Sequence, residues 1–170
     1  MNSHTDYHDV KIIDWVTATR ILSRTMRKDK SLVLVNGTFD WIHIGHISLL
    51  EYASTCGDIL LVLTNSDESI KRLKGNSRPL INLPHRLKTL SSLHCVDWVA
   101  PFYTDTITYI LDQLKPDVWV KGSDYSFETI DREEMHVANE VGINIKIMPK
   151  IENFSTTSLL EKIRFTGDTT

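Results

Sequence analysis

The sequence has few cysteines, no long apolar run and no large excess of either charge. Its two cysteines, Cys56 and Cys95, match no metal-binding or redox spacing. No stretch approaches the ~20 apolar residues needed to cross a bilayer, and the N-terminus lacks the basic start and apolar core of a secretory signal. The formal net charge of -3 gives no reason to expect a nucleic-acid or membrane surface. We therefore expect a cytoplasmic protein with reduced thiols.

A balanced composition accompanies these absences. Hydrophobic residues make up 41% and charged residues 24% of the sequence, the proportions of a globular domain that buries its own core. The length of 170 residues is typical of one domain, and there is no internal repeat or low-complexity linker. We expect a disordered or loosely held segment over 1–13, a helix within 14–30, one domain over 31–165 and a tail over 166–170.

Short apolar runs alternate with segments of helical periodicity along the chain. The runs predict five buried strands, at residues 31–36, 58–65, 96–101, 117–122 and 143–149, the third ended by Pro101. Helices are predicted at 14–27, 45–55, 83–93, 106–114, 129–142 and 155–164, and 69–80 is interpreted only as a basic stretch. This alternation predicts an α/β protein with a doubly wound, five-stranded parallel sheet covered on both faces.

The residues that follow the strands have the composition of a phosphate and ribose site. They are rich in Gly, Ser, Thr, Lys, His and Asp, as in "GTFDWIHIGH" after the first strand and "KGSDY" after the fourth. In doubly wound folds, ligands bind beyond the carboxyl ends of the strands. We therefore expect the binding site at this edge of the sheet.

Two histidines, His43 and His46, flank Gly45 at the first strand-to-helix turn. A zinc site is disfavoured, because H-E-x-x-H sites space their histidines four apart and no third ligand or cysteine cluster follows here. Burial in the hydrophobic core is possible for one of these histidines. It is a weaker explanation for two histidines that flank a glycine at a strand-to-helix turn.

Phosphate binding accounts for more of this stretch. The start of a helix offers free backbone N–H groups and the positive end of a dipole to an anion. Gly45 leaves room for a close approach, and imidazoles donate hydrogen bonds to phosphoryl oxygens. Asp40, in the same turn, could orient a histidine, bind Mg²⁺ or close the turn, and the sequence leaves these three roles open.

The same residues resemble a known signature. "GTFDWIHIGH" is similar to the G-[TC]-F-D-x-x-H-x-G-H motif of the cytidylyltransferase-like nucleotidyltransferases. "STTSLL", from Ser155, is similar to the S-T-T-x-[IL] motif that opens their last helix. The resemblance runs from about Ser31 to Arg164 and implies the Rossmann-like nucleotidyltransferase fold of the HxGH type.

Further stretches resemble the branch of this superfamily that adenylates D-glycero-manno-heptose 1-phosphate. "NSDESIKRLKGNSRP" and "PDVWVKGSDY" are similar to its patterns N-S-D-x-S-[VI]-x-x-[LK]-K-G-x-x-R-P and P-D-x-L-V-K-G-x-D-Y. The branch often has Cys at the position of Thr38 and Gly at that of Ser123. Glycerol-3-phosphate cytidylyltransferases share the two core motifs, but they usually lack the K-G-x-x-R-P segment and carry Arg near the position of Lys150.

The resemblance implies roles for individual residues. His43, His46 and Lys74 would bind the triphosphate and stabilise the transition state, with Mg²⁺ held mainly through the nucleotide phosphates and its protein ligands unknown. Nucleotide binding is implied for Gly37, Thr38, Phe39, His43, Gly45, His46, Lys121, Gly122, Asp124, Phe154, Ser155, Thr156 and Thr157. Contacts to the sugar phosphate are implied for Asp40, Asn65, Asp67, Arg78 and Arg86. Asp67 and Arg86 could instead order the loops, and Arg78 could simply anchor its own loop.

The resulting prediction is an enzyme that joins the AMP unit of ATP to D-glycero-manno-heptose 1-phosphate and releases pyrophosphate. Two alternatives stay open: a cytidylyltransferase acting on glycerol 3-phosphate or another alcohol phosphate, and a non-catalytic nucleotide-binding module. Relatives are commonly dimers, so the resemblance implies a homodimer. The sugar kinase domain fused to many relatives is expected to be a separate protein here.

Overall fold

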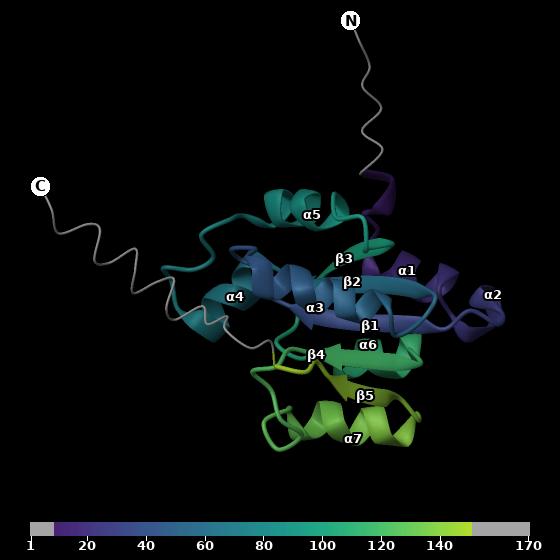
Figure 1. Ribbon diagram of the computed structural model, residues 1–170. Coiled ribbons are helices and arrows are strands. Elements are labelled where there is room, and N and C mark those ends of the chain that lie inside the picture. The colour runs from purple at the N-terminus through teal and green to yellow at the C-terminus, as the bar shows by residue number, and fades with distance from the viewer. Residues whose placement is uncertain (1–8, 151–170) are drawn as a thin grey trace, which may run out of the picture.

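A parallel sheet of five strands forms the centre of the structure, a computed structural model that describes residues 9–150 (Figure 1). The strands are β1 (Leu32–Gly37), β2 (Ile59–Asn65), β3 (Trp98–Phe102), β4 (Val118–Lys121) and β5 (Asn144–Ile147). Their order in the sheet is β3-β2-β1-β4-β5, and each neighbouring pair is parallel, which confirms the predicted doubly wound fold. The direction of winding reverses between β1 and β4, so the switch point lies beyond their carboxyl ends.

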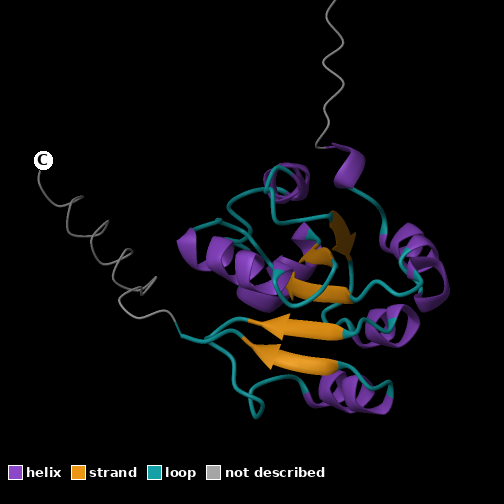
Figure 2. Cartoon of the chain, turned by 45° about the vertical axis from the view of Figure 1, so that its right-hand side comes forward, coloured by secondary structure: helices purple, strands orange, loops and turns teal. Residues whose placement is uncertain are grey.

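Helices cover both faces of this sheet (Figure 2). They are η1 (Asp9–Lys11), α1 (Trp15–Ile21), α2 (Arg24–Arg27), α3 (Ile44–Ser54), α4 (Asp67–Lys74), α5 (Leu83–Ser91), α6 (Thr108–Leu114) and α7 (Arg132–Glu140). Leu32 and Leu34 face the core shared with α1, α6 and α7, whereas Val33 and Val35 face the core shared with α3 and α5. Within residues 9–150, no helix is long and apolar enough to cross a membrane.

The segment expected to form one helix over 14–27 forms two short ones. Asp14 caps α1, where its side chain accepts a hydrogen bond from the Thr17 N–H at 2.8 Å. Ser23 has the extended dihedrals φ -58° and ψ 152°, which interrupts the helix before α2 begins. The prediction of a single helix was therefore wrong at Ser23.

One helix, α4, lies in the stretch that was interpreted only as basic. Its N-cap, Ser66, accepts a hydrogen bond from the Ser69 N–H at 3.2 Å. Acidic residues in the first turn and basic residues in the last complement the helix dipole; they are Asp67, Glu68, Lys71, Arg72 and Lys74. Prediction from apolar periodicity missed α4, because Ile70 is its one buried apolar residue and Leu73 is 52% exposed, which leaves no apolar face to recognise.

Two features of the edge strand β3 differ from expectation. Pro101 lies within β3 instead of ending it, which is tolerated because an edge strand can dispense with one ladder N–H. Residues 9–13, which we expected to be disordered or loosely held, are attached to this strand. Ile12 forms a parallel bridge with Val99, and the Ile13 N–H donates to the Val99 carbonyl at 2.9 Å.

Asp117 joins the start of β4 to β1 and α2, which makes its effect on stability testable. Its carboxylate accepts hydrogen bonds from the Leu32 N–H at 2.7 Å and from the buried Arg27 guanidinium at 2.8 Å. We expect Asp117→Ala to lower the free energy of unfolding by about 2–4 kcal/mol, because both donors lose a charged partner. Urea unfolding would measure the change.

The matched control is Asp112→Ala on α6, where the carboxylate accepts a hydrogen bond from the neighbouring Gln113 side chain. This substitution should change the free energy of unfolding by less than about 0.5 kcal/mol. Equal effects of the two substitutions would contradict the role given to Asp117.

Candidate active site

The chain turns sharply after β1, and this turn forms one wall of the site. Phe39 has a φ of 43°, in the left-handed region that non-glycine residues rarely adopt, and its ring is buried. The carbonyl of Thr38 accepts hydrogen bonds from the Thr64 hydroxyl at 3.1 Å and from the Arg86 guanidinium at 2.8 Å. These bonds hold the turn in a conformation that Phe39 alone would disfavour.

The two histidines of the motif lie at the start of α3. His43 is the N-cap, and its Nδ1 accepts a hydrogen bond from the Gly45 N–H at 3.1 Å. The rings of His43 and His46 stack with centroids 3.9 Å apart and planes inclined by 30°. A Cβ atom on Gly45 would lie 3.0 Å from two atoms of the His43 ring. Glycine at this position therefore permits the ring of His43 to fold back over the helix terminus.

Burial disfavours the protonated form of both histidines in the free protein. Burial, followed by the nearby His43 and Lys74, lowers the pKa of His46 to about 4, and Asp124 only partly opposes this. Burial also lowers the pKa of His43. Within the described chain, Nδ1 of His46 is buried and has no hydrogen-bond partner. A buried, unpaired imidazole nitrogen costs free energy unless a ligand satisfies it.

Helix α4 brings a cation to the turn after β1. The Lys74 ammonium donates to the Thr38 hydroxyl at 3.1 Å, so a residue near the end of α4 meets a residue of the turn. Two residues earlier on α4, Arg72 binds Asp105 with Nη2 and Oδ1 2.7 Å apart. This pair ties α4 to the loop between β3 and α6.

Asp40 anchors the loop that follows α4. Its carboxylate accepts hydrogen bonds from the Arg78 guanidinium at 2.8 Å, the Leu80 N–H at 2.6 Å and the Ile81 N–H at 2.9 Å. Burial acts to raise the pKa of Asp40, but the bonds from Ile81, Arg78 and Leu80 outweigh it and leave the pKa below its usual value. The observed role of Asp40 is to fasten this loop, which differs from the three roles that the sequence left open. Arg78 is its partner in that loop.

Arg86 is an internal residue that is bonded to the protein itself. Its side chain is 1% exposed, and it donates to the carbonyls of Ile81, Thr38 and Asn65, to the Thr64 hydroxyl and to the Asp67 carboxylate. A guanidinium has five N–H groups, so these five bonds occupy all of them. Arg86 and its partner Asp67 therefore order the loops, the second of the two roles that the sequence allowed.

Lys121, at the end of β4, contributes a buried ammonium to the site. The residue is 5% exposed, and its Nζ lies 3.2 Å from Oδ1 of Asn36 and 3.7 Å from Oε2 of Glu134. It also lies 4.1 Å from the centroid of the Trp119 ring and 4.9 Å from that of Tyr125. Burial lowers the pKa of Lys121, and Glu134 opposes the shift. The ammonium thus has acidic and aromatic neighbours in a water-poor setting.

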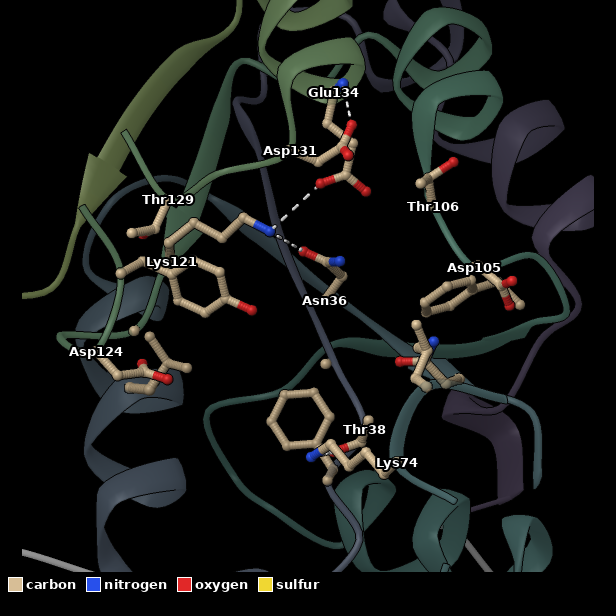
Figure 3. A pocket seen from close by; sticks show the side chains of 18 of the residues that line it. Asn36, Thr38, Lys74, Asp105, Thr106, Lys121, Asp124, Thr129, Asp131 and Glu134 are labelled. Carbon is tan, nitrogen blue, oxygen red and sulfur yellow. Dashed lines mark hydrogen bonds and ion pairs between the residues drawn. The ribbon is translucent and has the colours of Figure 1, made fainter. Parts of the chain in front are cut away.

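These elements surround a pocket of about 560 Å³ beyond the carboxyl ends of the strands (Figure 3). The residues expected from the sequence that line it are Gly37, Thr38, Phe39, His46, Asn65, Lys74, Lys121, Gly122 and Asp124. Expected residues within 9–150 that lie outside its wall are Asp40, His43, Gly45, Asp67, Arg78 and Arg86. Phe154, Ser155, Thr156 and Thr157 lie outside the described residues.

Sequence reasoning did not single out several residues of the wall. They are Asn36, Leu49, Leu73, Phe102, Asp105, Thr106, Tyr125, Thr129, Asp131 and Glu134. Asp105 and Thr106 follow the third strand, so the rule about strand ends could have identified them. Asp131 and Glu134 fall within the helix predicted at 129–142, and no local pattern shows that this helix begins at the pocket.

Metal ligands are not grouped in the described part of the chain. Between residues 9 and 150, no three His, Cys, Asp or Glu side chains gather in a way that could hold a metal ion. The two cysteines there, Cys56 and Cys95, are both free.

A histidine pair at a helix N-terminus and a lysine facing it, at the switch point of a doubly wound sheet, define a nucleotidyltransferase-type site. Residues 34–162 match the cytidylyltransferase-like family. The chain belongs to this family and is a nucleotidyltransferase.

Curated relatives support this assignment. The chain is 42% identical, over 86% of its length, to the bifunctional protein HldE of Haemophilus influenzae (strain PittGG). It is 37% identical, over 96% of its length, to the bifunctional protein HldE of Syntrophotalea carbinolica. The matched regions cover 30% and 33% of these relatives, so the chain spans about a third of their length.

Solved structures share the fold. A lipopolysaccharide core biosynthesis protein from Thermoplasma volcanium is 28% identical with a TM-score of 0.61, and the match covers 72% of this chain and 99% of that protein. Pantoate-beta-alanine ligase from Francisella tularensis is 15% identical with a TM-score of 0.57, and the match covers 92% of this chain and 77% of that protein. The second match shows the fold alone.

The low pKa of His46 predicts a pH dependence of stability. An exposed histidine in the unfolded chain takes up a proton near its ordinary pKa of 6.5, whereas folded His46 takes one up at about 4. The stability contributed by neutral His46 is therefore fully present above pH 6.5. It is lost as the pH falls from 6.5 to about 4. Imidazole NMR titration would measure the pKa, and urea unfolding on both sides of pH 6.5 would measure the stability.

The control is His46→Gln, which assigns the NMR signal and should flatten this part of the stability profile. A measured pKa near 6.5 for His46 would contradict the burial described here.

Proposed function

We propose that the protein transfers the adenylyl group of ATP to D-glycero-manno-heptose 1-phosphate in the cytoplasm, forming ADP-heptose and pyrophosphate. The observation that carries the transfer chemistry is the stacked His43 and His46 pair at the start of α3, with Lys74 nearby. The choice of acceptor is supported by the resemblance of "NSDESIKRLKGNSRP" and "PDVWVKGSDY" to the heptose branch. The similarity to the HldE proteins over most of the chain agrees with it.

The reaction needs no strong base. The phosphate group of the sugar phosphate is already ionised at neutral pH, and one of its oxygens attacks the α-phosphorus of ATP. A new P–O bond forms while the bond from the α-phosphorus to its bridging oxygen breaks, and pyrophosphate leaves with that electron pair. Catalysis then depends on holding two anions in line and on stabilising the charge that develops.

His46 and Lys74 supply charge stabilisation in this scheme. In the free protein, burial and the repulsion from Lys74 keep His46 neutral. A bound triphosphate reverses this balance, because its negative charge favours donors and the protonated ring. The unpaired Nδ1 of His46 then gains a phosphate oxygen as its partner. The N-terminus of α3 adds free backbone N–H groups.

Mg²⁺ fits this site as an ion held through the nucleotide. The described residues provide no cage of metal-binding side chains, and Mg²⁺ is commonly bound by substrate phosphates and water with one or two carboxylates. Asp124, on the wall of the pocket, is a carboxylate available for that purpose. The bound ion would neutralise part of the triphosphate charge.

Exposed apolar side chains support a homodimer as part of this proposal. Trp41, which is 63% exposed, lies with Leu80 and Ile81 around a second, largely apolar pocket of about 280 Å³. Apolar groups of this kind are often covered by a partner subunit.

Pyrophosphate release tests the proposed reaction. ATP, CTP and GTP would each be combined with D-glycero-manno-heptose 1-phosphate, mannose 1-phosphate and glycerol 3-phosphate. We expect release to be fastest with ATP and the heptose phosphate. Fastest release with CTP and glycerol 3-phosphate would replace this function by the cytidylyltransferase alternative, and no release with any pair would favour a binding module.

His46→Ala tests the role of the histidine pair. We expect turnover to fall by about 10²–10³-fold, because one preorganised donor to the transition state is lost. Steady-state kinetics would measure the loss, and circular dichroism would verify the fold. His85→Ala, an exposed histidine on α5, is the matched control and should leave turnover unchanged. Near-normal turnover of His46→Ala would remove His46 from the mechanism.

A further inference from the structure

The pocket extends past the residues that handle phosphate into a region that they do not reach. We call this region the polar lobe and define it by five residues of the wall: Asn36, Thr106, Lys121, Asp131 and Glu134. They come from the end of β1, the loop before α6, the end of β4 and the start of α7. Figure 3 shows Asp131, Glu134 and Thr106 on the side of Asn36 away from Thr38 and Lys74.

Contacts between these residues make the lobe one continuous surface. Lys121 contacts both Asn36 and Glu134, and Asp131 also acts electrostatically on its ammonium. Asp131 caps α7, where its Oδ1 accepts the N–H groups of Glu133 and Glu134. Glu134 in turn accepts the N–H of Ile107, the residue after Thr106, at 2.9 Å. The lobe is therefore built into the fold and is not a chance gathering of surface side chains.

The charge of the lobe is unsuited to phosphate. One cation, Lys121, faces the two carboxylates of Asp131 and Glu134, which gives the five residues a net charge of -1 (one positive less two negative). A triphosphate would meet repulsion here, whereas Lys74 and the start of α3 attract it. The phosphates therefore belong to the other side of the pocket.

The hydrogen-bonding capacity of the lobe fits hydroxyl groups. An ammonium has three N–H groups, and Lys121 directs two of them toward Asn36 and Glu134, leaving one for a ligand. Oδ1 of Asp131 accepts the two N–H groups that it caps, and among residues 9–150 its Oδ2 has no hydrogen-bond partner. The amide N–H groups of Asn36 add donors. A hydroxyl both donates and accepts, so neighbouring carboxylates, amide and ammonium can satisfy several of them together.

We propose that the polar lobe binds the hydroxyl groups of the sugar in the acceptor, and that Asp131 is a determinant of its affinity. The proposal rests on the proposed function, because it takes the acceptor to be a sugar phosphate. The sugar phosphate lies with its phosphate toward Lys74 and its ring toward Asp131 and Glu134. An acceptor without a polyhydroxylated body leaves the lobe unfilled and is used less well.

Asp131→Asn is the substitution that separates ligand binding from folding. Asparagine caps helices about as well as aspartate, so α7 keeps its start. The substitution removes the carboxylate charge and gives one oxygen site a donor in place of an acceptor. Asp112→Asn, which makes the same chemical change on α6, is the control. Thr106→Val tests the opposite wall with a substitution of nearly equal size.

The experiment measures kcat and KM with ATP and D-glycero-manno-heptose 1-phosphate for the wild type and these variants, together with their melting temperatures. We expect Asp131→Asn to raise KM for the sugar phosphate by about 10- to 100-fold, the range expected for losing a hydrogen bond to a charged group. The KM for ATP should stay within about twofold, and Thr106→Val should raise the sugar phosphate KM by a smaller factor. Titration calorimetry with the sugar phosphate should show the same loss of affinity.

Other outcomes overturn the proposal. An unchanged sugar phosphate KM in Asp131→Asn would show that the lobe does not bind the sugar, and an equal rise in the KM for ATP would assign it to the nucleotide. If the wild type releases no pyrophosphate with any sugar phosphate, the proposed function itself fails, a result visible before any variant is compared.

Discussion

The guanidinium group of Arg86 is the interaction on which the site depends. Buried within α5, it uses its five N–H groups to join the turn after β1, the end of β2, the start of α4 and the loop fastened by Asp40. A lysine could not replace it, because an ammonium has three N–H groups and no planar fork. Thr38 and Lys74, which meet in the pocket, belong to two of the segments that Arg86 joins. The geometry of the proposed phosphate site is therefore set by a buried cation whose N–H groups all bind the protein itself.

The pocket places its charges unevenly, and this suits the joining of two unlike substrates. At one side, Lys74 offers positive charge and His46 offers an unpaired ring nitrogen for the proposed phosphates. At the other, Lys121 is balanced by Asp131 and Glu134 in a setting better suited to hydroxyl groups. A nucleotide and a sugar phosphate can then meet with their phosphates together near α3. Like charges are brought close only where the protein compensates them.

The sequence predicted the fold and the strand-to-helix turn that carries the two histidines well, because both depend on local patterns. Continuous apolar runs follow from burial on both faces of the sheet, and the HxGH motif lies within one strand-to-helix turn. Roles set by distant contacts could not be predicted in this way. The sequence left the roles of Arg86 and Asp40 open, because their hydrogen-bond partners lie up to 48 residues away. Glu134 and Asp131 reach the pocket only because α7 packs beside α6.

The attachment of Ile12 to β3 also protects the protein from self-association through its sheet. An open edge strand presents unpaired N–H and C=O groups that can recruit a strand from another molecule. At β3, Ile12 and Ile13 occupy part of the ladder, and Pro101 removes one of its donors. At the opposite side, β5 is only four residues long and carries Lys146. The same features that make this sheet irregular at its margins disfavour edge-to-edge pairing with another molecule.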